Sequence, residues 1–247
     1  MIEKKELLEL AKLNGLKPWQ QEKHYIQAII LEILAEQPLV FKGGTYLWFF
    51  HGLPRFSEDL DFTAKEKLQE NIFESVKRSL ELFGVENSVK KISDNETTLS
   101  FRISAKGPLN TASIDECRVY VEISKREKIL KKPLSIKLDF PAYNLPTKRI
   151  PGMDLEEVAA EKIRAIMTRD KARDIFDLQY LIEKKSVAFN KELADKKLAF
   201  YGTNFSTQEF AQKIRQEQPF FEKELKNLVF TELPNFKQAM YIIQKWV

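Results

Sequence analysis

Residues 41–62, with the sequence FKGGTYLWFFHGLPRFSEDLDF, constrain the fold more than any other stretch of this chain. The apolar residues 39–41 before the glycines predict a short buried strand, and Gly43-Gly44 predicts a tight turn. Thr45 is the expected N-cap of a helix over residues 46–51, and the glycine and proline that follow end it. The stretch therefore predicts a strand, a glycine turn and a short helix in immediate succession.

Two aspartates follow this helix. In a strand the side chains alternate between faces, so Asp59 and Asp61 are expected on one face while Leu60 and Phe62 point into the core. Two neighbouring carboxylates repel each other unless a positive charge lies between them. Hard oxygen ligands of this kind favour a divalent metal, Mg²⁺ or Mn²⁺.

The strings KGGT and RFSEDLDF together resemble the AbiEii/AbiGii-type nucleotidyltransferase toxins of abortive-infection and toxin–antitoxin systems, within the polymerase-β-like nucleotidyltransferase superfamily. The resemblance implies that Asp59 and Asp61 hold the metal and act in catalysis. It also implies residues that bind the triphosphate nucleotide, and among these we expect Gly43, Gly44, Thr45, Arg55 and Ser57.

Members of this superfamily commonly add a third carboxylate from a neighbouring strand. Residues 118–124 alternate, with Val119, Val121 and Ile123 on one face, so Glu122 lies on the other face of an expected strand. The resemblance assigns the third metal ligand to Glu122. Asp139 shows the same alternation in the next extended segment and remains the alternative.

A second element of the resemblance lies in the helical half of the chain. Residues 155–168 are apolar at helical spacing behind a capping box at Asp154, and Lys162 lies on this expected helix. An RD-x-x-D element follows, with Asp174 and Asp177 three residues apart. The resemblance implies that Lys162 offers its ammonium group to the triphosphate oxygens and that Asp174 acts beside it, with Asp177 as support.

The order of the expected elements predicts an α/β (α+β) fold, in which a small mixed sheet is flanked by helices and followed by a helical domain. We expect a nucleotidyltransferase core with N-terminal helices over residues 1–150. A helical domain over residues 151–247 is expected to complete the active site, so that acids from the first part and Lys162 from the second meet over one triphosphate.

Composition excludes several classes of protein. The 247 residues are 43% hydrophobic and 31% charged, which is typical of a globular protein, and no run is apolar enough to predict a membrane span or signal peptide. One cysteine and two histidines argue against a disulfide framework and a zinc site, and fit a cytoplasmic protein. A net charge of +4 does not by itself indicate nucleic acid, so lysine clusters such as Lys90-Lys91 matter only if they converge beside the acidic pair.

The function implied by the resemblance is metal-dependent transfer of a nucleotide from an NTP to an acceptor, with RNA, and specifically the 3′ end of tRNA, as the expected acceptor. A cognate antitoxin is the implied protein partner. Two alternatives remain open: nucleotidylation of a protein hydroxyl, and a non-catalytic module that binds nucleotide or RNA. Because both aspartates of the first motif are present, the non-catalytic alternative is less favoured.

Overall fold

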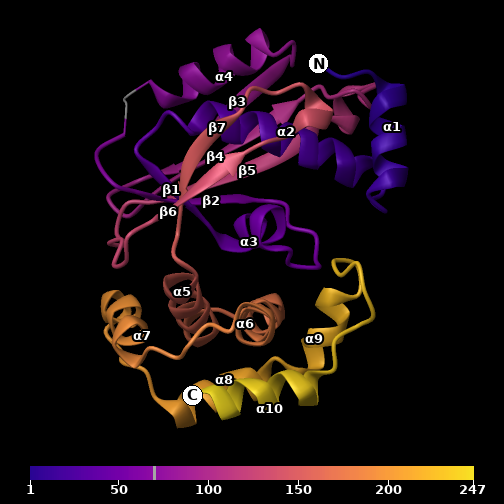
Figure 1. Cartoon of the computed structure of the whole chain (residues 1–247). Helices are drawn as coiled ribbons and strands as arrows, with labels where there is room; N and C mark the ends of the chain where they lie inside the picture. Colours follow the sequence, from indigo (N-terminus) through magenta and orange to yellow (C-terminus); the bar gives the residue numbers. More distant parts are fainter. Residues whose placement is uncertain (69–70) are drawn as a thin grey trace. The chain divides into compact units, whose positions relative to one another are not determined.

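The computed structural model describes residues 1–68 and 71–247 and shows a mixed α/β protein (Figure 1). The described residues form two compact units. The sheet unit comprises Met1–Tyr46, Glu58–Ile129 and Pro133–Gly152, and the helical unit comprises Leu47–Ser57, Leu130–Lys132 and Met153–Val247. The α/β class with a mixed sheet and flanking helices is confirmed.

The sheet unit is built on one seven-stranded sheet with the order β3-β4-β5-β2-β1-β7-β6. Strand β2 runs parallel to β5 and antiparallel to β1, and β1 runs parallel to β7, so the sheet is mixed as predicted. Its strands are β1 (Leu39–Lys42), β2 (Leu60–Ala64), β3 (Asn87–Asp94), β4 (Thr98–Ala105), β5 (Cys117–Ser124), β6 (Leu134–Leu138) and β7 (Lys148–Gly152).

Three helices of the sheet unit are α1 (Lys4–Leu13), α2 (Pro18–Leu34) and α4 (Ile72–Leu82). Helices α2 and α4 contact each other and lie on the same face of the sheet, against β5 and β3 respectively (Figure 1). Apolar residues recur at helical spacing over residues 65–83 and predict a helix there, but residues 65–68 lack helical structure and α4 begins only at Ile72. Residues 69 and 70 of that expected helix lie outside the described residues.

The strand alternation predicted around the acidic pair is confirmed. Leu60 and Phe62 are fully buried, whereas Asp61 between them is half-buried. On β5, Val121 and Ile123 are buried while Glu122 is exposed. One face of this part of the sheet is therefore apolar and covered, and the other carries the carboxylates.

Helix α3 (Gly43–His51) follows β1 directly, and the chain passes along it from the sheet unit into the helical unit after Tyr46. It begins at Gly43, three residues before the predicted first helical residue. The left-handed backbone of Gly43, with φ of 81°, lets the chain turn from β1 into the helix without an intervening loop. Thr45 is therefore inside the helix, and the prediction that it is the N-cap was wrong.

The helical unit is built around α5 and α6, which pack against each other, with α7 and α8 against α5 and with α9 and α10 against α6. Asp154 caps α5 by accepting a hydrogen bond from the backbone N–H of Glu156, and the predicted bounds of this helix are confirmed. The helices are α5 (Leu155–Thr168), α6 (Ala172–Lys185), α7 (Lys191–Leu198), α8 (Thr207–Gln216), α9 (Gln218–Leu225) and α10 (Phe236–Trp246).

The segment Leu47–Ser57 belongs to the helical unit through several backbone contacts. The Tyr180 hydroxyl donates to the carbonyl of His51 at 2.6 Å, and the N–H of Phe56 donates to the carbonyl of Leu228 at 2.7 Å. An isolated β-bridge also joins Arg55 to Val229. These contacts position the residues that lead into the acidic pair.

Among the helices of the described residues, none has both the length and the hydrophobicity that a bilayer crossing requires.

One buried acid of the sheet unit has an unusual environment. Glu32 on α2 is fully buried, and neither carboxylate oxygen has a hydrogen-bond partner among the described residues. The nearby Lys148 donates instead to the backbone carbonyl of Glu32 at 3.2 Å and to the carboxylate of Glu36 at 2.7 Å. Burial raises the pKa of Glu32 to about 7, although the charge of Lys148 opposes this shift.

We expect Glu32→Gln to stabilise the protein above neutral pH. Because the folded-state pKa is raised, the contribution of the protonated acid is fully present below the unfolded value of 4.5 and is lost as pH rises through about 7. The amide cannot ionise, so the variant avoids this loss. Urea unfolding should show a gain of roughly 2 kcal/mol at about pH 8 and little gain at about pH 5.

The matched control is Glu9→Gln, the same substitution at an exposed position of α1. It should leave the stability difference near zero at both pH values. If Glu32→Gln gave the same gain at both pH values, ionisation of Glu32 would not be its cause.

Candidate functional site

Neighbouring strands place three charged residues in one row of the sheet unit. Lys42 on β1 pairs in register with Asp61 on β2, and Asp61 pairs in register with Glu122 on β5. Residues paired in register point to the same face of a sheet, so the row presents two carboxylates and one ammonium group together.

Gly43 lies directly against the Asp61 carboxylate. A Cβ atom built on Gly43 would stand 2.2 Å from Oδ2 of Asp61, far inside van der Waals contact. Together with the positive φ of Gly43, this contact excludes any other residue at the turn. The carboxylate is therefore held at the start of α3, where the backbone is free of side chains.

Asp59 is fixed to the same helix through its backbone. The Thr45 hydroxyl donates to the Asp59 carbonyl at 2.5 Å, and Thr45 is itself fully buried. Asp59 immediately precedes β2 and is half-buried. The glycine turn and the acidic pair, which are separated in sequence by the α3 segment, thus meet at one end of β1 and β2.

The strand order distinguishes the two candidates for the third carboxylate. Strand β5, which carries Glu122, is the direct neighbour of β2. Asp139 follows β6 at the far edge of the sheet, and β1 and β7 lie between β6 and β2. Asp139 also pairs with Lys137. Of the two, only Glu122 lies beside Asp61.

The oxygen donors in this row fit a divalent ion that is shared with a substrate. Among the described residues, no three or more His, Cys, Asp or Glu side chains form a group that could hold a metal ion. Mg²⁺ is commonly held by one or two carboxylates, with waters and substrate phosphates in the other positions. The pair of Asp61 and Glu122, with Asp59 two residues before Asp61, supplies the kind of oxygen donors that such an open site uses.

Lys42 is a site residue that the sequence analysis missed. Its side chain is 9% exposed and forms an ion pair at 2.5 Å with Glu127, whose side chain is 5% exposed. A lysine at the end of the buried apolar strand β1 is the signal that could have identified it, because a buried charge needs a specific reason.

A second charged cluster lies within the helical unit, where it is almost completely buried. The Lys162 ammonium on α5 lies 2.8 Å from Oδ1 of Asp174 and 2.5 Å from Oδ2 of Asp177, both on α6. Asp174 and Asp177 are at most 1% exposed, and Lys162 is 6% exposed. The predicted proximity of Lys162 to the RD-x-x-D element is therefore present in the structure.

Two arginines complete this cluster. Arg55 donates from Nε and Nη2 to the two carboxylate oxygens of Asp177 at 2.5 and 2.6 Å, and Arg169 donates from Nε to Asp174 at 2.9 Å. Burial alone would raise the pKa of both aspartates. The charges of Lys162 and Arg169 on Asp174, and of Arg55 and Lys162 on Asp177, outweigh burial and hold both pKa values below the ordinary range.

The predicted site residues thus form two groups, one within each unit. Lys162, Asp174 and Arg55 are together in the helical unit, where Ser57 is half-buried at the end of the Leu47–Ser57 segment. The sheet unit brings together Gly43, Gly44, Thr45, Asp59, Asp61 and Glu122.

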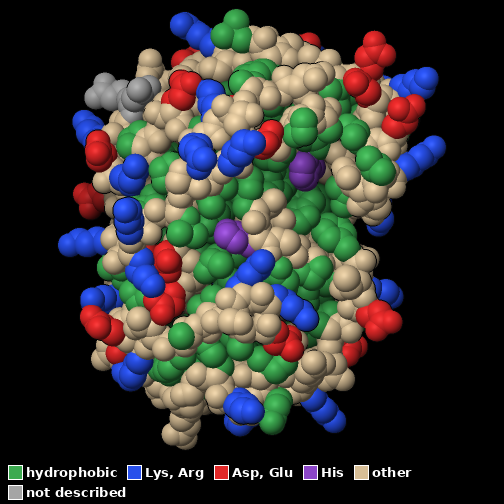
Figure 2. Space-filling model, viewed as in Figure 1, with side chains coloured by type: hydrophobic (Ala, Val, Ile, Leu, Met, Phe, Trp, Pro, Cys, Tyr) green, Lys and Arg blue, Asp and Glu red, His purple; other side chains and the backbone are tan. Residues whose placement is uncertain are grey.

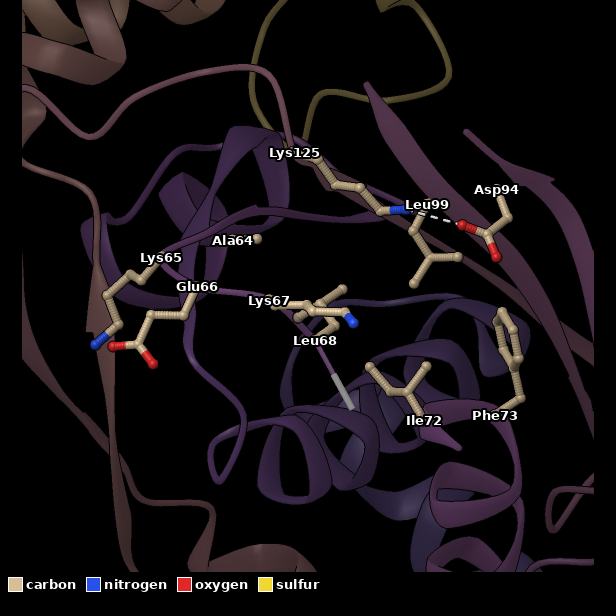
Figure 3. Close-up of a pocket in the computed structure, with 10 residues that line it drawn as sticks. All are labelled: Ala64, Lys65, Glu66, Lys67, Leu68, Ile72, Phe73, Asp94, Leu99 and Lys125. Carbon is tan, nitrogen blue, oxygen red and sulfur yellow. Dashed lines mark hydrogen bonds and ion pairs between the residues drawn. The ribbon is translucent and has the colours of Figure 1, made fainter. Parts of the chain in front are cut away.

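A pocket of about 430 Å³ lies elsewhere in the sheet unit, beyond the carboxyl end of β2 (Figure 3). In this view Lys125 reaches Asp94, with which it forms an ion pair at 2.8 Å. None of the predicted site residues is among the described residues that line this pocket. We therefore assign it no part in the site.

Basic side chains lie among acidic ones on the face that Figure 2 shows. Lys131 pairs with Asp154 at 3.3 Å and also with Glu156, so part of this charge is neutralised locally.

Comparison with known proteins identifies the family and the fold. The model of the AbiEii nucleotidyl transferase toxin family, type IV toxin–antitoxin system, matches residues 26–240. No curated protein sequence matches the chain.

Two solved structures share the fold. JHP933 from Helicobacter pylori has a TM-score of 0.61 and 21% identity, over 93% of this chain and 90% of that one. MenT4, a nucleotidyltransferase toxin from Mycobacterium tuberculosis H37Rv, has a TM-score of 0.63 and 21% identity, over 92% of this chain and 82% of that one. Because the family match covers most of the sequence, this chain belongs to the AbiEii family and is a nucleotidyltransferase toxin of the type IV toxin–antitoxin class.

Proposed function

We propose that this nucleotidyltransferase is metal-dependent and transfers a nucleotide from an NTP to RNA, with the 3′ end of tRNA as the acceptor. The observation that supports the proposal is the register that places Asp61 beside Glu122, with the Asp61 carboxylate against the bare backbone of Gly43. A cognate antitoxin is the proposed protein partner, as expected for a toxin of this class.

Asp61 and Glu122, with Asp59 two residues before Asp61, are the proposed ligands of Mg²⁺ or Mn²⁺, and waters and substrate phosphates would complete the coordination, because these three carboxylates do not by themselves form a metal-holding group in the structure. When bound, the ion would lower the pKa of the attacking hydroxyl and offset charge at the α-phosphorus. Gly43 lets the Asp61 carboxylate lie against the backbone at the first turn of α3. Gly43 and Gly44 remain proposed contacts of the triphosphate through their backbone, because the N–H groups at a helix N-terminus favour anions. Because the Thr45 hydroxyl donates its hydrogen bond to the backbone carbonyl of Asp59, we propose that Thr45 holds Asp59 in place. Ser57 remains a proposed nucleotide contact.

Lys162 and Asp174 are the proposed functional residues of the helical unit. Lys162 would neutralise charge that develops on the leaving pyrophosphate, a role suited to a lysine ammonium. Its position is fixed from two sides by Asp174 and Asp177. Arg55 binds Asp177 through two hydrogen bonds, so we assign Arg55 to positioning this cluster rather than to direct contact with the nucleotide.

We expect Asp61→Asn to reduce nucleotide transfer at least about a hundredfold, and Glu122→Gln to reduce it about tenfold or more, because each removes charge from the metal ligands. The assay is incorporation of each labelled NTP into total tRNA, with Mg²⁺ or Mn²⁺ added after chelation. The matched control, Asp139→Asn, changes an exposed acid at the far edge of the sheet and should retain activity.

The same assay distinguishes the alternative functions. Label on protein with none on RNA would indicate nucleotidylation of a protein hydroxyl. Absence of label, accompanied by an NTP-induced rise in melting temperature, would indicate a binding module without catalysis. Equal activity in Asp61→Asn and Asp139→Asn would contradict the proposed metal site.

The role of Lys162 can be separated from its contribution to folding by a comparison with Lys197. Lys197 is also a buried lysine held by two carboxylates, Glu157 at 2.7 Å and Glu161 at 3.0 Å. Lys162→Met and Lys197→Met should each lower the free energy of unfolding by about 3 kcal/mol, because each leaves buried carboxylates with one cation fewer. Only Lys162→Met should also abolish transfer, measured under conditions where both variants are folded.

Urea unfolding and kcat/KM for the NTP are the measurements, with Lys162→Arg as a variant that keeps the charge. A purely structural role for Lys162 predicts that the two methionine variants lose activity to the same extent.

A further inference from the structure

One face of β5 is exposed, and its side chains form a line along the strand that ends at Glu122. Along this strand Cys117, Val119, Val121 and Ile123 are buried, and the alternate residues Arg118, Tyr120 and Glu122 are exposed. Helices α2 and α4 pack against the sheet on the face that carries the buried set. The exposed set therefore forms an uncovered line along the strand.

The neighbouring strands add cations to this line. Arg102 on β4 pairs in register with Tyr120, and Lys90 on β3 pairs in register with Arg102. Lys90, Arg102 and Tyr120 consequently form one row across three strands, on the same face. We call these three residues the basic–aromatic row.

The basic–aromatic row is adjacent to the row of proposed metal ligands. Tyr120 precedes Glu122 by two residues on β5, and Glu122 is in register with Asp61. Alternate residues on one strand face are spaced by about 7 Å. This spacing is close to the length of one nucleotide in an extended single-stranded nucleic acid. A nucleic-acid strand that runs along β5 with its end at Asp61 and Glu122 would therefore place its next nucleotide over Tyr120.

Two side chains of the basic–aromatic row are open to a ligand, because Tyr120 is 44% exposed and Lys90 is exposed. Arg102 between them is half-buried, and its Nε atom is buried without a hydrogen-bond partner. Within residues 1–68 and 71–247, neither Lys90 nor Arg102 forms an ion pair. An exposed aromatic ring at the end of a row of two cations is a combination suited to single-stranded nucleic acid.

We propose that the basic–aromatic row binds the unpaired 3′ end of the RNA acceptor, with a base stacked on Tyr120 and the adjacent phosphates on Arg102 and Lys90. The assignment rests on the proposed function, because it takes RNA as the acceptor. A single strand fits better than a duplex, since the bases of a duplex are stacked on each other and leave no free face for Tyr120. Arg118, also exposed, extends the same line by one further position.

The test is the affinity of the full chain for a fluorescein-labelled single-stranded RNA with a free 3′ hydroxyl, measured by anisotropy over a range of salt without NTP. Tyr120→Ala should weaken binding about tenfold, with the salt dependence unchanged. Lys90→Gln with Arg102→Gln should weaken it about tenfold or more. The double variant should also reduce the slope of log K against log salt by about 1.4, from the loss of two phosphate contacts.

Matched controls lie outside the row. Tyr241→Ala removes another exposed tyrosine, and Lys137→Gln removes an exposed lysine at the far edge of the sheet. Both should bind the RNA as the unchanged protein does. Tyr120→Phe should retain affinity, and thermal melting should show that all the variants are folded.

Several outcomes would overturn the assignment. These are unchanged RNA affinity in Tyr120→Ala and in the double variant, equal losses in the controls, or binding of duplex RNA as tightly as single strands. If Tyr120→Ala removed the NTP-induced thermal shift while RNA binding persisted, the row would belong to the NTP. If the unchanged protein bound single-stranded RNA at this row but transferred no nucleotide to it, the proposed function would fail while the assignment would stand.

Discussion

The register of β2 against its neighbours is the constraint on which the candidate site depends. Side chains alternate along a strand, so a slip of one residue would turn Leu60 and Phe62 toward solvent and Asp61 into the core. Burial of those two apolar side chains therefore fixes where the Asp61 carboxylate points. The same register sets Glu122 beside Asp61 and Lys42 on its other side, so the core of the sheet unit determines the geometry of its charged row.

The acidic residues of the two units differ in burial and in their charged neighbours. In the helical unit, Asp174 and Asp177 are buried and each accepts hydrogen bonds from cationic side chains, which is the condition under which buried carboxylates are tolerated. In the sheet unit, Asp61 and Glu122 lie side by side with like charge, and Glu122 is exposed. An arrangement that contributes little to stability is typical of residues retained for a ligand. The buried cluster, by contrast, joins α5 to α6, because Lys162 on α5 is paired with Asp174 and Asp177 on α6.

Sequence patterns predicted the parts of the structure that local physics controls. Alternation predicted the burial of Leu60 and Phe62 and the exposure of Glu122, and the capping residue Asp154 predicted where α5 begins. A local pattern failed at residues 65–68, which continue a helical spacing of apolar residues but are not helical in the structure. They also could not show that Arg55 binds Asp177, since that pair joins residues 122 positions apart. The choice between Glu122 and Asp139 required the strand order, which no single segment contains.

Each compact unit consists of three stretches that alternate along the chain, so the backbone crosses between the units five times. The segment Leu47–Ser57 shows what this means, because it is enclosed in sequence by Thr45 and Asp59, which are hydrogen-bonded to each other in the sheet unit. Neither unit can be exchanged between homologous genes at a single crossover without leaving some of its own sequence behind. The toxin is therefore expected to be inherited and to diverge as one indivisible module, in contrast to enzymes assembled from contiguous domains.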